Sequence, residues 1–186
     1  DPRDAFLSVK HARFEDLPRE EWDAMIRTNL SGVFLLSQAV GRVMIRQRGG
    51  KIVNVSSVAA RSGSRGMAAY AAAKAGVTAL TQSLGAEWAK HGITVNAVAP
   101  GPVETEGVLE VWKTPAMIAQ AAREVPLGRV GRPEEIAWAV IFVASEAGPK
   151  VRRHSRMEIY PRPVGDRDRR AAGRRLQGGG VAAVAG

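Results

Sequence analysis

Apolar residues recur along the chain in two alternating patterns. Over 18–49 they return every three or four positions, which predicts a long helix that begins near Pro18 and ends at the glycine pair 49–50. The run 51–56 is β-branched and apolar on both faces, as in a buried strand of a parallel sheet. The same order follows again, with a helix expected over 67–90 and a buried strand over 93–98.

Two more helices are expected over 114–124 and 133–145, the second with Pro133 at its start. The segments 1–14 and 59–66 show neither period and are expected to be loops. Because strands alternate with helices, we expect parallel strands joined by right-handed crossovers. The predicted fold class is therefore α/β.

The basic charge is concentrated at one end of the chain. The formal net charge is +9, yet residues 1–149 hold 17 basic and 15 acidic side chains, whereas 150–186 hold 10 and 3. This last segment has no sustained apolar period, so we expect a basic, disordered tail. Its only aromatic residue is Tyr160, too few for base stacking, and no nucleic-acid partner is expected.

The composition argues against thiol chemistry, metal binding and membrane insertion. The chain has no cysteine, and therefore no disulfide, thiol nucleophile or thiolate metal site. His11, His91 and His154 are scattered without metal-ligand spacing, so we expect no metal site. There is no run of eighteen apolar residues and no signal-peptide pattern at the start, so we expect a cytoplasmic protein without a membrane partner.

Tyr70 and Lys74 are the first candidates for catalysis. They lie four residues apart in an alanine-rich run that favours helix, so their side chains share a helix face. The ordinary pKa of a tyrosine is about 10, and a neighbouring ammonium favours the phenolate. We therefore expect Lys74 to lower the pKa of Tyr70 towards the range of a general acid/base. The pair is equally typical of a surface lysine that extends past a half-buried tyrosine.

Ser57 lies thirteen residues before Tyr70, directly after the predicted strand 51–56. A strand that ends there places the Ser57 hydroxyl at the carboxyl edge of the sheet, where open α/β folds bind ligands. The alternative is a serine that caps a turn at the end of a strand.

Four motifs occur in one order along the chain: Asn29-Leu30-Ser31-Gly32, Ser57, Tyr70-x-x-x-Lys74, and Pro100-Gly101 after the strand 93–98. In this order and spacing, the chain resembles the short-chain dehydrogenase/reductase family from about Phe14 to Gly148, nearest to its 3-oxoacyl-carrier-protein-reductase-like and glucose-dehydrogenase-like members. The resemblance implies part of a Rossmann-type doubly wound parallel sheet that lacks its N-terminal strands. It divides the chain into a catalytic part, 1–149, and the tail, 150–186.

The resemblance also implies catalytic roles. Tyr70 would protonate the substrate oxygen, and Ser57 would hold that oxygen. Lys74 would assist Tyr70 and hydrogen-bond the nicotinamide ribose. Asn29 would hold a water molecule that passes protons to Lys74; as a helical asparagine it is otherwise expected to mark a cap or a kink.

The segment 100–105 resembles the one that lies against the nicotinamide in the family. The implied cofactor-binding residues are Tyr70, Lys74, Pro100, Gly101, Val103 and Thr105, for either NAD or NADP. An ordinary turn is the alternative reading of Pro100 and Gly101. The family's glycine-rich turn, Thr-Gly-x-x-x-Gly-x-Gly, does not occur in these 186 residues.

Residues 106–125 fall where the family has a mobile substrate lid. Their apolar side chains either form a wall of the substrate site or pack the lid itself, and the sequence leaves both open: Val108, Leu109, Val111, Trp112 and Met117. The resemblance implies an NAD(P)-dependent oxidoreductase that interconverts a ketone and a secondary alcohol, and a homo-oligomer. The alternative is an inactive, truncated copy whose long helices retain only an association role.

Overall fold

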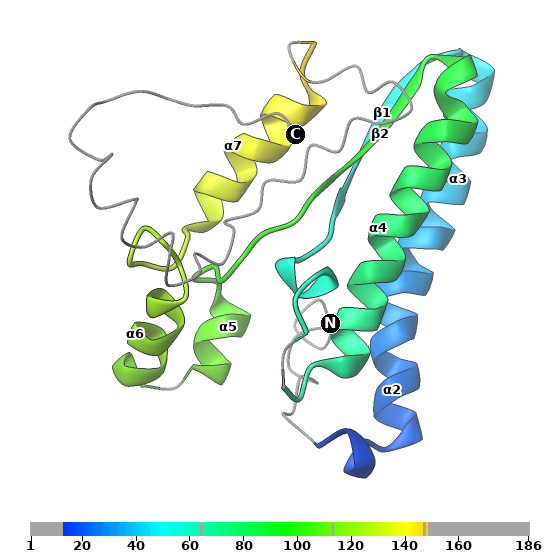
Figure 1. The fold of residues 1–186 in the computed structure, drawn as a ribbon. Coiled ribbons are helices and arrows are strands. Elements are labelled where there is room, and N and C mark those ends of the chain that lie inside the picture. The colour runs from blue at the N-terminus through cyan, green and yellow to red at the C-terminus, as the bar shows by residue number, and fades with distance from the viewer. Residues whose placement is uncertain (1–12, 64, 113, 147, 149–186) are drawn as a thin grey trace, which may run out of the picture.

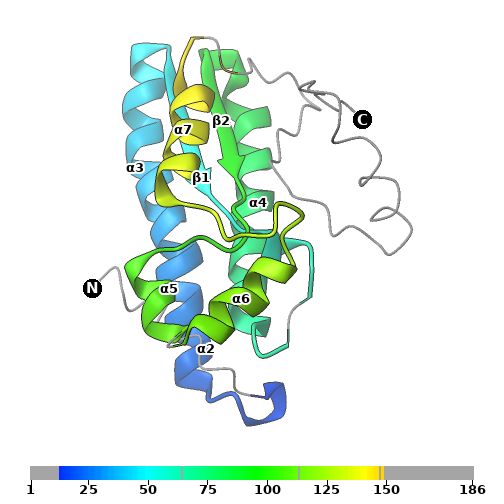
Figure 2. The same ribbon diagram turned by 90° about the vertical axis from the view of Figure 1, so that its left-hand side faces the viewer.

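The computed structural model describes residues 13–63, 65–112, 114–146 and 148. Within them, β1 (Gly50–Val55) and β2 (Ile93–Val98) pair in parallel, in a register that runs from Gly50 opposite Ile93 to Val55 opposite Val98. Helices α3 (Gly32–Gln47) and α4 (Ala68–Trp88) cover one face of this sheet and α7 (Pro133–Ala144) covers the other (Figures 1 and 2). The α/β class and the parallel pairing are confirmed.

The predicted long helix over 18–49 is present, but it is not uniform. Helix α2 (Arg19–Ile26) follows Pro18, and a π-helical turn (Arg27–Ser31) comes next. Helix α3 follows directly, because Ser31 and Gly32 keep right-handed helical φ and ψ angles. The expectation that Gly49 and Gly50 end the helix is wrong in detail. Arg48 takes the left-handed conformation, with φ 53°, and Gly50 already belongs to β1.

The second long helix and the strand after it are confirmed. Helix α4 ends at Trp88 and a 3₁₀ turn (Ala89–His91) leads through Gly92, at φ 73°, into β2. Trp88, Ile93 and Val95 form a buried cluster between the sheet and the two long helices. The ring of Trp88 lies so close to Gly41 of α3 that an added Cβ would stand 2.8 Å from its Cζ2 atom, which explains a glycine inside this helix.

The remaining elements lie near the carboxyl ends of the strands. A 3₁₀ turn (Phe14–Asp16) precedes α2, and another (Val58–Ala60) follows β1. Helices α5 (Glu106–Val111) and α6 (Pro115–Arg123) lie beside each other below the sheet in both ribbon views. Helices α6 and α7 were expected, whereas α5 was not; Thr105 caps it by accepting a hydrogen bond from the Val108 amide at 3.4 Å.

The burial of β1 differs from its expectation, whereas the tail stays a prediction. β1 was expected to be buried on both faces, but Val55 is 47 % exposed and only Asn54 of the strand is buried. This difference follows from its neighbours, since β2 is the only strand that pairs with β1 among the described residues. The predicted tail, 150–186, lies outside the described residues. Among those described, no helix is long and apolar enough to cross a membrane, and no group of three or more potential ligands could hold a metal ion.

Candidate active site

The site begins where the two strands end. The parallel pairing continues past both strands, because the Ser56 amide donates to the Val98 carbonyl at 2.8 Å and the Val58 amide donates to the Pro100 carbonyl at 3.0 Å. Ser57 therefore lies opposite the start of the segment 100–105. The sheet edge thus joins the two motifs that the sequence placed at strand ends.

Tyr70 reaches Ser57 from the first turn of α4. The Ser57 side chain lies close enough to the Tyr70 phenol to lower its pKa as a hydrogen-bond partner. Ser57 also accepts a hydrogen bond from the Ala59 amide at 3.2 Å, which leaves the Ser57 proton for the phenol oxygen. The ring of Tyr70 packs beside the buried pair Met25 and Ala69, so both ends of this side chain are fixed.

The pKa of Tyr70 corrects the expectation from the sequence. Burial raises the pKa of the phenol above its ordinary 10.0, and the Ser57 hydrogen bond offsets only part of this rise. The predicted lowering by Lys74 is therefore wrong as the dominant effect. The raised pKa keeps Tyr70 protonated at neutral pH, as a proton donor must be.

Lys74 lies one helical turn beyond Tyr70. Its Nζ is 5.6 Å from the centroid of the Tyr70 ring and donates to the Val55 carbonyl at 3.1 Å. Burial lowers the pKa of this ammonium. An ammonium has three donors, so the contact with Val55 leaves capacity for further acceptors in the site.

Asn29 occupies the π-helical turn. It is buried, and its Nδ2 lies 3.3 Å from the Met25 carbonyl oxygen and 3.1 Å from the Met25 sulfur. The turn that carries it packs against α4, the helix of Tyr70 and Lys74. The structure thus fits both readings of this residue, since a π-helical turn is a local irregularity and such turns are frequent at functional sites.

The segment 100–105 is held by a second contact. Val103 forms a parallel bridge with Gly131: the Glu104 amide donates to the Gly131 carbonyl at 2.8 Å, and the Gly131 amide donates to the Pro102 carbonyl at 2.9 Å. Thr105 is exposed, and its hydroxyl caps α5. The cofactor-binding roles expected for Pro100, Gly101, Val103 and Thr105 remain predictions.

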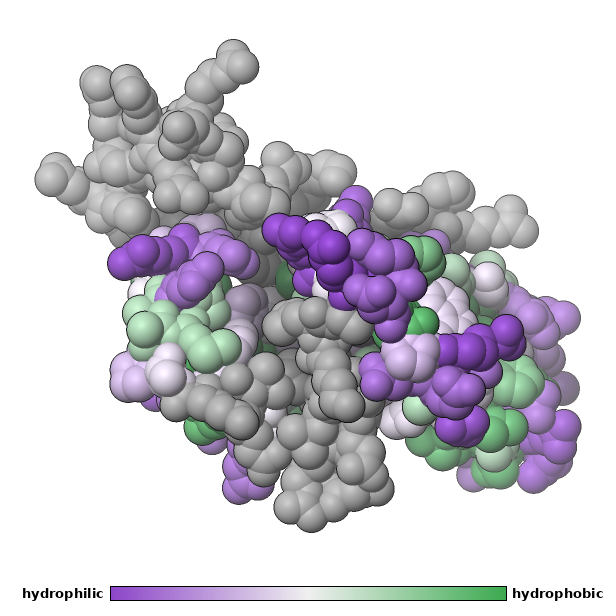
Figure 3. Space-filling view, turned by 90° about the horizontal axis from the view of Figure 1, so that it is seen from below, coloured by the Kyte–Doolittle hydropathy of each residue, from purple (hydrophilic) through white to green (hydrophobic). Residues whose placement is uncertain are grey.

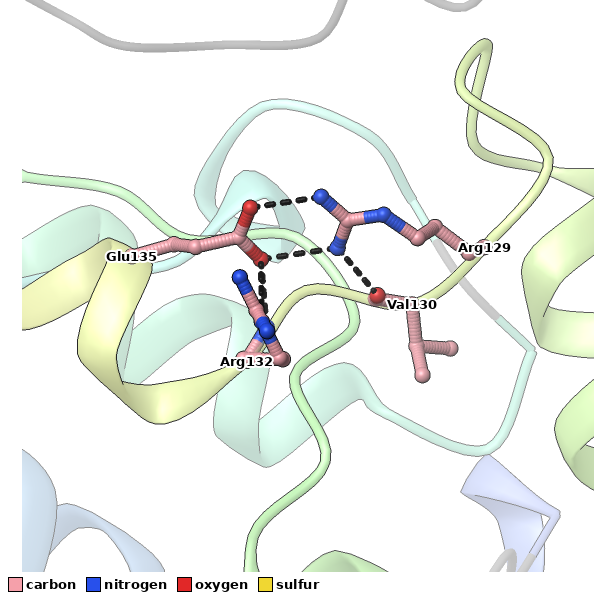
Figure 4. A network of polar contacts seen from close by, with 4 residues as sticks. All are labelled: Arg129, Val130, Arg132 and Glu135. Carbon is pink, nitrogen blue, oxygen red and sulfur yellow. Dashed lines mark hydrogen bonds and ion pairs between the residues drawn. The ribbon is translucent and has the colours of Figure 1, made fainter.

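An ion-pair network lies beside Gly131, the residue that pairs with Val103 in this bridge (Figure 4). The Glu135 carboxylate accepts from both Arg129 terminal nitrogens, at 2.6 and 2.8 Å, and from the Arg132 amide at 2.7 Å. Arg129 also donates to the Val130 carbonyl at 3.1 Å. Glu135 thereby caps α7 and orders the loop that carries Gly131.

Glu135→Gln is expected to loosen the bridge between Gly131 and the segment 100–105. Hydrogen bonds from Arg129 lower the pKa of Glu135 from 4.5 to about 2. Its stabilising effect is therefore complete above about pH 4.5 and is lost as the pH falls through about 2. Hydrogen exchange of the Glu104 and Gly131 amides at pH 7 measures the effect and should be faster in the variant.

Glu134→Gln is the matched control, because Glu134 is the exposed neighbour on the same helix turn. In the Glu134→Gln variant, the Glu104 and Gly131 amides should exchange as fast as in the wild type. Equal exchange rates in all three proteins at pH 7 would show that the network does not hold this segment.

The apolar residues of the segment 106–125 differ in their exposure. Val108 is 6 % exposed and packs inward, whereas Leu109 and Met117 are 38 % and 40 % exposed. Viewed from the carboxyl ends of the strands, hydrophilic and hydrophobic surface is interspersed on the visible described residues (Figure 3). Val108 thus packs inside the fold, and the lid role of this segment with its two readings stays a prediction.

Sequence reasoning missed a set of buried and half-buried polar residues between β1 and α4. These residues are Asn54, Ser56, Thr78 and Thr81. Ser56 donates to the Lys74 carbonyl at 3.0 Å, and Asn54 donates to Thr81 at 2.8 Å. Asn54 and Ser56 are two polar residues spaced two apart along the strand, so they share one face, and this was the available signal.

Comparisons with known proteins agree with this fold. A family model described as enoyl-(acyl carrier protein) reductase matches residues 4–153. The chain is 48 % identical over 131 residues to the 3-oxoacyl-[acyl-carrier-protein] reductase FabG of Vibrio cholerae, which covers 69 % of the chain and 52 % of the relative. It is 46 % identical over 130 residues to the short-chain reductase protein NovJ of Streptomyces niveus, covering 67 % and 49 %.

Solved structures agree. A gluconate 5-dehydrogenase of Burkholderia cenocepacia, in complex with NADP and tartrate, superposes with a TM-score of 0.70 at 39 % identity and covers 73 % of this chain and 53 % of that one. The chain spans about half the length of the curated relatives that it matches. With its sheet, its strand-end serine and its tyrosine–lysine helix, the chain belongs to the short-chain dehydrogenase/reductase family.

Proposed function

We propose that this chain carries the proton-transfer part of an NAD(P)-dependent oxidoreductase that interconverts a ketone and a secondary alcohol. The observation that supports this most is the hydrogen bond between Ser57 and Tyr70 at the carboxyl edge of the sheet, one helical turn from Lys74. A hydroxyl donor, a protonated phenol and an ammonium there suit a carbonyl oxygen that gains negative charge.

In the reduction, the Ser57 hydroxyl turns from the phenol oxygen to the substrate oxygen, donates its hydrogen bond there and so orients the substrate. Tyr70 transfers its proton to that oxygen, and the phenol is left as phenolate while the carbonyl becomes an alcohol. Lys74 stabilises the phenolate through its positive charge. Asn29 holds the water that returns a proton towards Lys74. In the oxidation each proton moves in the opposite direction, with the phenolate as base.

The residues present fit a nicotinamide cofactor. Lys74 has donors to offer a ribose beyond the one used by Val55, and Tyr70 lies beside it. The segment from Pro100 to Thr105 would lie against the nicotinamide, where Gly101 and Val103 present backbone groups. NAD or NADP, when bound, supplies or accepts the hydride at the carbonyl carbon.

The names of the relatives suggest the substrate class. One matched protein is a 3-oxoacyl-[acyl-carrier-protein] reductase and another is a gluconate 5-dehydrogenase in complex with NADP. We therefore propose a small-molecule ketone next to a polar or acyl group, and its secondary alcohol.

The experiment is a cofactor-oxidation assay of the purified 186-residue chain. NADH and NADPH are each followed by absorbance with a 3-oxoacyl thioester and with a keto sugar acid. We expect ketone-dependent oxidation of at least one coenzyme. If neither coenzyme is oxidised above the protein-free rate with either substrate, this chain is not a working oxidoreductase.

A second candidate function, association without catalysis, rests on the exposed apolar side chains of α3. Leu35 is 61 % exposed, Leu36 is 66 % and Phe34 is 46 %. Exposed apolar side chains of this size, clustered in one region, often mark an interface. We propose that α3 pairs with a second copy of this chain.

Leu35→Glu is expected to shift the chain towards monomer in sedimentation velocity, because it places a charge in the apolar contact. Gln47→Glu, at the end of the same helix, is the control and should sediment as the wild type. A wild-type chain that sediments as a monomer at high concentration would exclude this role.

A further inference from the structure

Three consecutive residues at the end of β1 hold the two catalytic side chains of α4. The Val55 carbonyl accepts from the Lys74 ammonium at 3.1 Å. The Ser56 hydroxyl donates to the Lys74 backbone carbonyl at 3.0 Å. The Ser57 side chain is hydrogen-bonded to Tyr70. Lys74 is therefore tied to the strand at both its backbone and its side chain.

The middle contact is built from two hydroxyls, those of the buried Ser56 and the half-buried Thr78. Ser56 is 3 % exposed, and its oxygen lies 2.8 Å from Thr78 Oγ1, which is itself 3.1 Å from the Lys74 carbonyl oxygen. Both hydroxyls lie within donor distance of the Lys74 carbonyl, and two hydroxyl protons serve the three contacts of this triangle. A buried hydroxyl such as that of Ser56 would lose its partners if it left this arrangement, which makes the position of α4 against β1 specific.

A second contact of the same kind lies farther from the site. Asn54 Nδ2 donates to Thr81 Oγ1 at 2.8 Å, and Thr81 donates to the Val77 carbonyl at 2.8 Å. Asn54 and Thr81 are 8 % and 5 % exposed. This pair also joins β1 to α4, but it touches neither Lys74 nor Thr78 in the described contacts. It is therefore an internal comparison for the Ser56 contact.

We propose that Ser56 and Thr78 are positioning residues: by clamping the Lys74 carbonyl to the end of β1, they set the contact between Tyr70 and Ser57. An active site gains from such support because a displacement of about 1 Å can cost about 10²-fold in rate. Ser56 acts through its neighbours and does not touch the substrate. The link to catalysis rests on the function proposed above, whereas the contact itself is measurable without any cofactor.

The test is a double-mutant cycle read by NMR at pH 7. The chain has two tyrosines, so Tyr160→Phe leaves Tyr70 as the only one, and labelling tyrosine Cζ with carbon-13 gives a single resonance. Ser57→Ala removes the hydrogen bond to Tyr70 and shifts this resonance. The shift is measured in the Tyr160→Phe chain and again after adding Ser56→Ala or Thr81→Val.

We expect Ser57→Ala to shift the resonance equally in the Tyr160→Phe chain and in the same chain with Thr81→Val. In the chain with Ser56→Ala, the shift caused by Ser57→Ala should be at least about twofold smaller. The reason is that only residues that share partners couple. Thermal unfolding is measured alongside. Both added substitutions remove a buried hydrogen bond between the same two elements, so both should lower the melting temperature. A merely structural role of Ser56 would move the melting temperature and leave the shift unchanged.

A full Ser57→Ala shift in the Ser56→Ala background would overturn the proposal. If Ser56→Ala does not fold, Thr78→Val replaces it, because it removes one of the two protons of the triangle; a reduced shift supports the proposal and a full shift overturns it. Thr78→Ser keeps the hydroxyl and should restore the full shift. An inactive wild type with these shifts would refute the proposed function and leave the positioning role standing.

Discussion

Tyr70→Phe is expected to lower the rate of ketone reduction by about 10²–10⁴-fold, the usual contribution of a positioned general acid. The substitution removes the phenol hydroxyl and its bond to Ser57 but keeps the ring that packs beside Met25 and Ala69. Ser57 retains its hydrogen bond from the Ala59 amide. The loss of stability should therefore be only about 1 kcal/mol, as for one hydrogen bond.

The rate is measured under saturating coenzyme, with circular dichroism to verify folding. Tyr160→Phe is the matched control, since it removes the only other tyrosine of the chain, and it should retain the wild-type rate. A Tyr70→Phe enzyme that is folded and fully active would remove Tyr70 from the mechanism.

Ile93→Ala should produce the largest loss of stability, about 2–5 kcal/mol, because it leaves a cavity in the core. Ile93 begins β2, is 2 % exposed, and packs with Trp88 and Val95 between the sheet and the two long helices. The same cluster holds α4, the helix of Tyr70 and Lys74, against the sheet. A loss here therefore weakens the support of the site as well as the fold.

Urea unfolding followed by tryptophan fluorescence gives the free energy of unfolding. Ile93→Val deletes a single methylene and should cost only about 0.5–1.5 kcal/mol. If the alanine variant were as stable as the valine variant, the cluster around Trp88 would not be the core that holds the helices to the sheet.

The sequence predicted most of the fold because its periods are strong and its breaks are clear. Helix α4 and strand β2 lie within two residues of their expected bounds. The hydrogen bond between Ser57 and Tyr70 agrees with their placement at one edge of the sheet. Helix α5 was missed because six residues are too few for a helical period to show.

The parts that sequence reasoning missed depend on contacts between distant segments. The sign of the pKa shift of Tyr70 is set by burial against α2, whereas the sequence revealed only the nearby lysine. Ser56 and Thr78 are 22 residues apart, and only the packing of β1 on α4 brings them together. The same holds for the bridge between Val103 and Gly131, which no local pattern indicates.

The central claim is that a half-buried, protonated Tyr70, hydrogen-bonded to Ser57, is the proton donor of this site. The most direct test is the carbon-13 resonance of Tyr70 Cζ at pH 10.0, the ordinary pKa of the phenol. We predict that Tyr70 is less than half ionised there, and less again in Ser57→Ala, which loses the hydrogen bond that lowers the pKa. A phenol that is half ionised or more at this pH, or that does not respond to Ser57→Ala, would contradict the account.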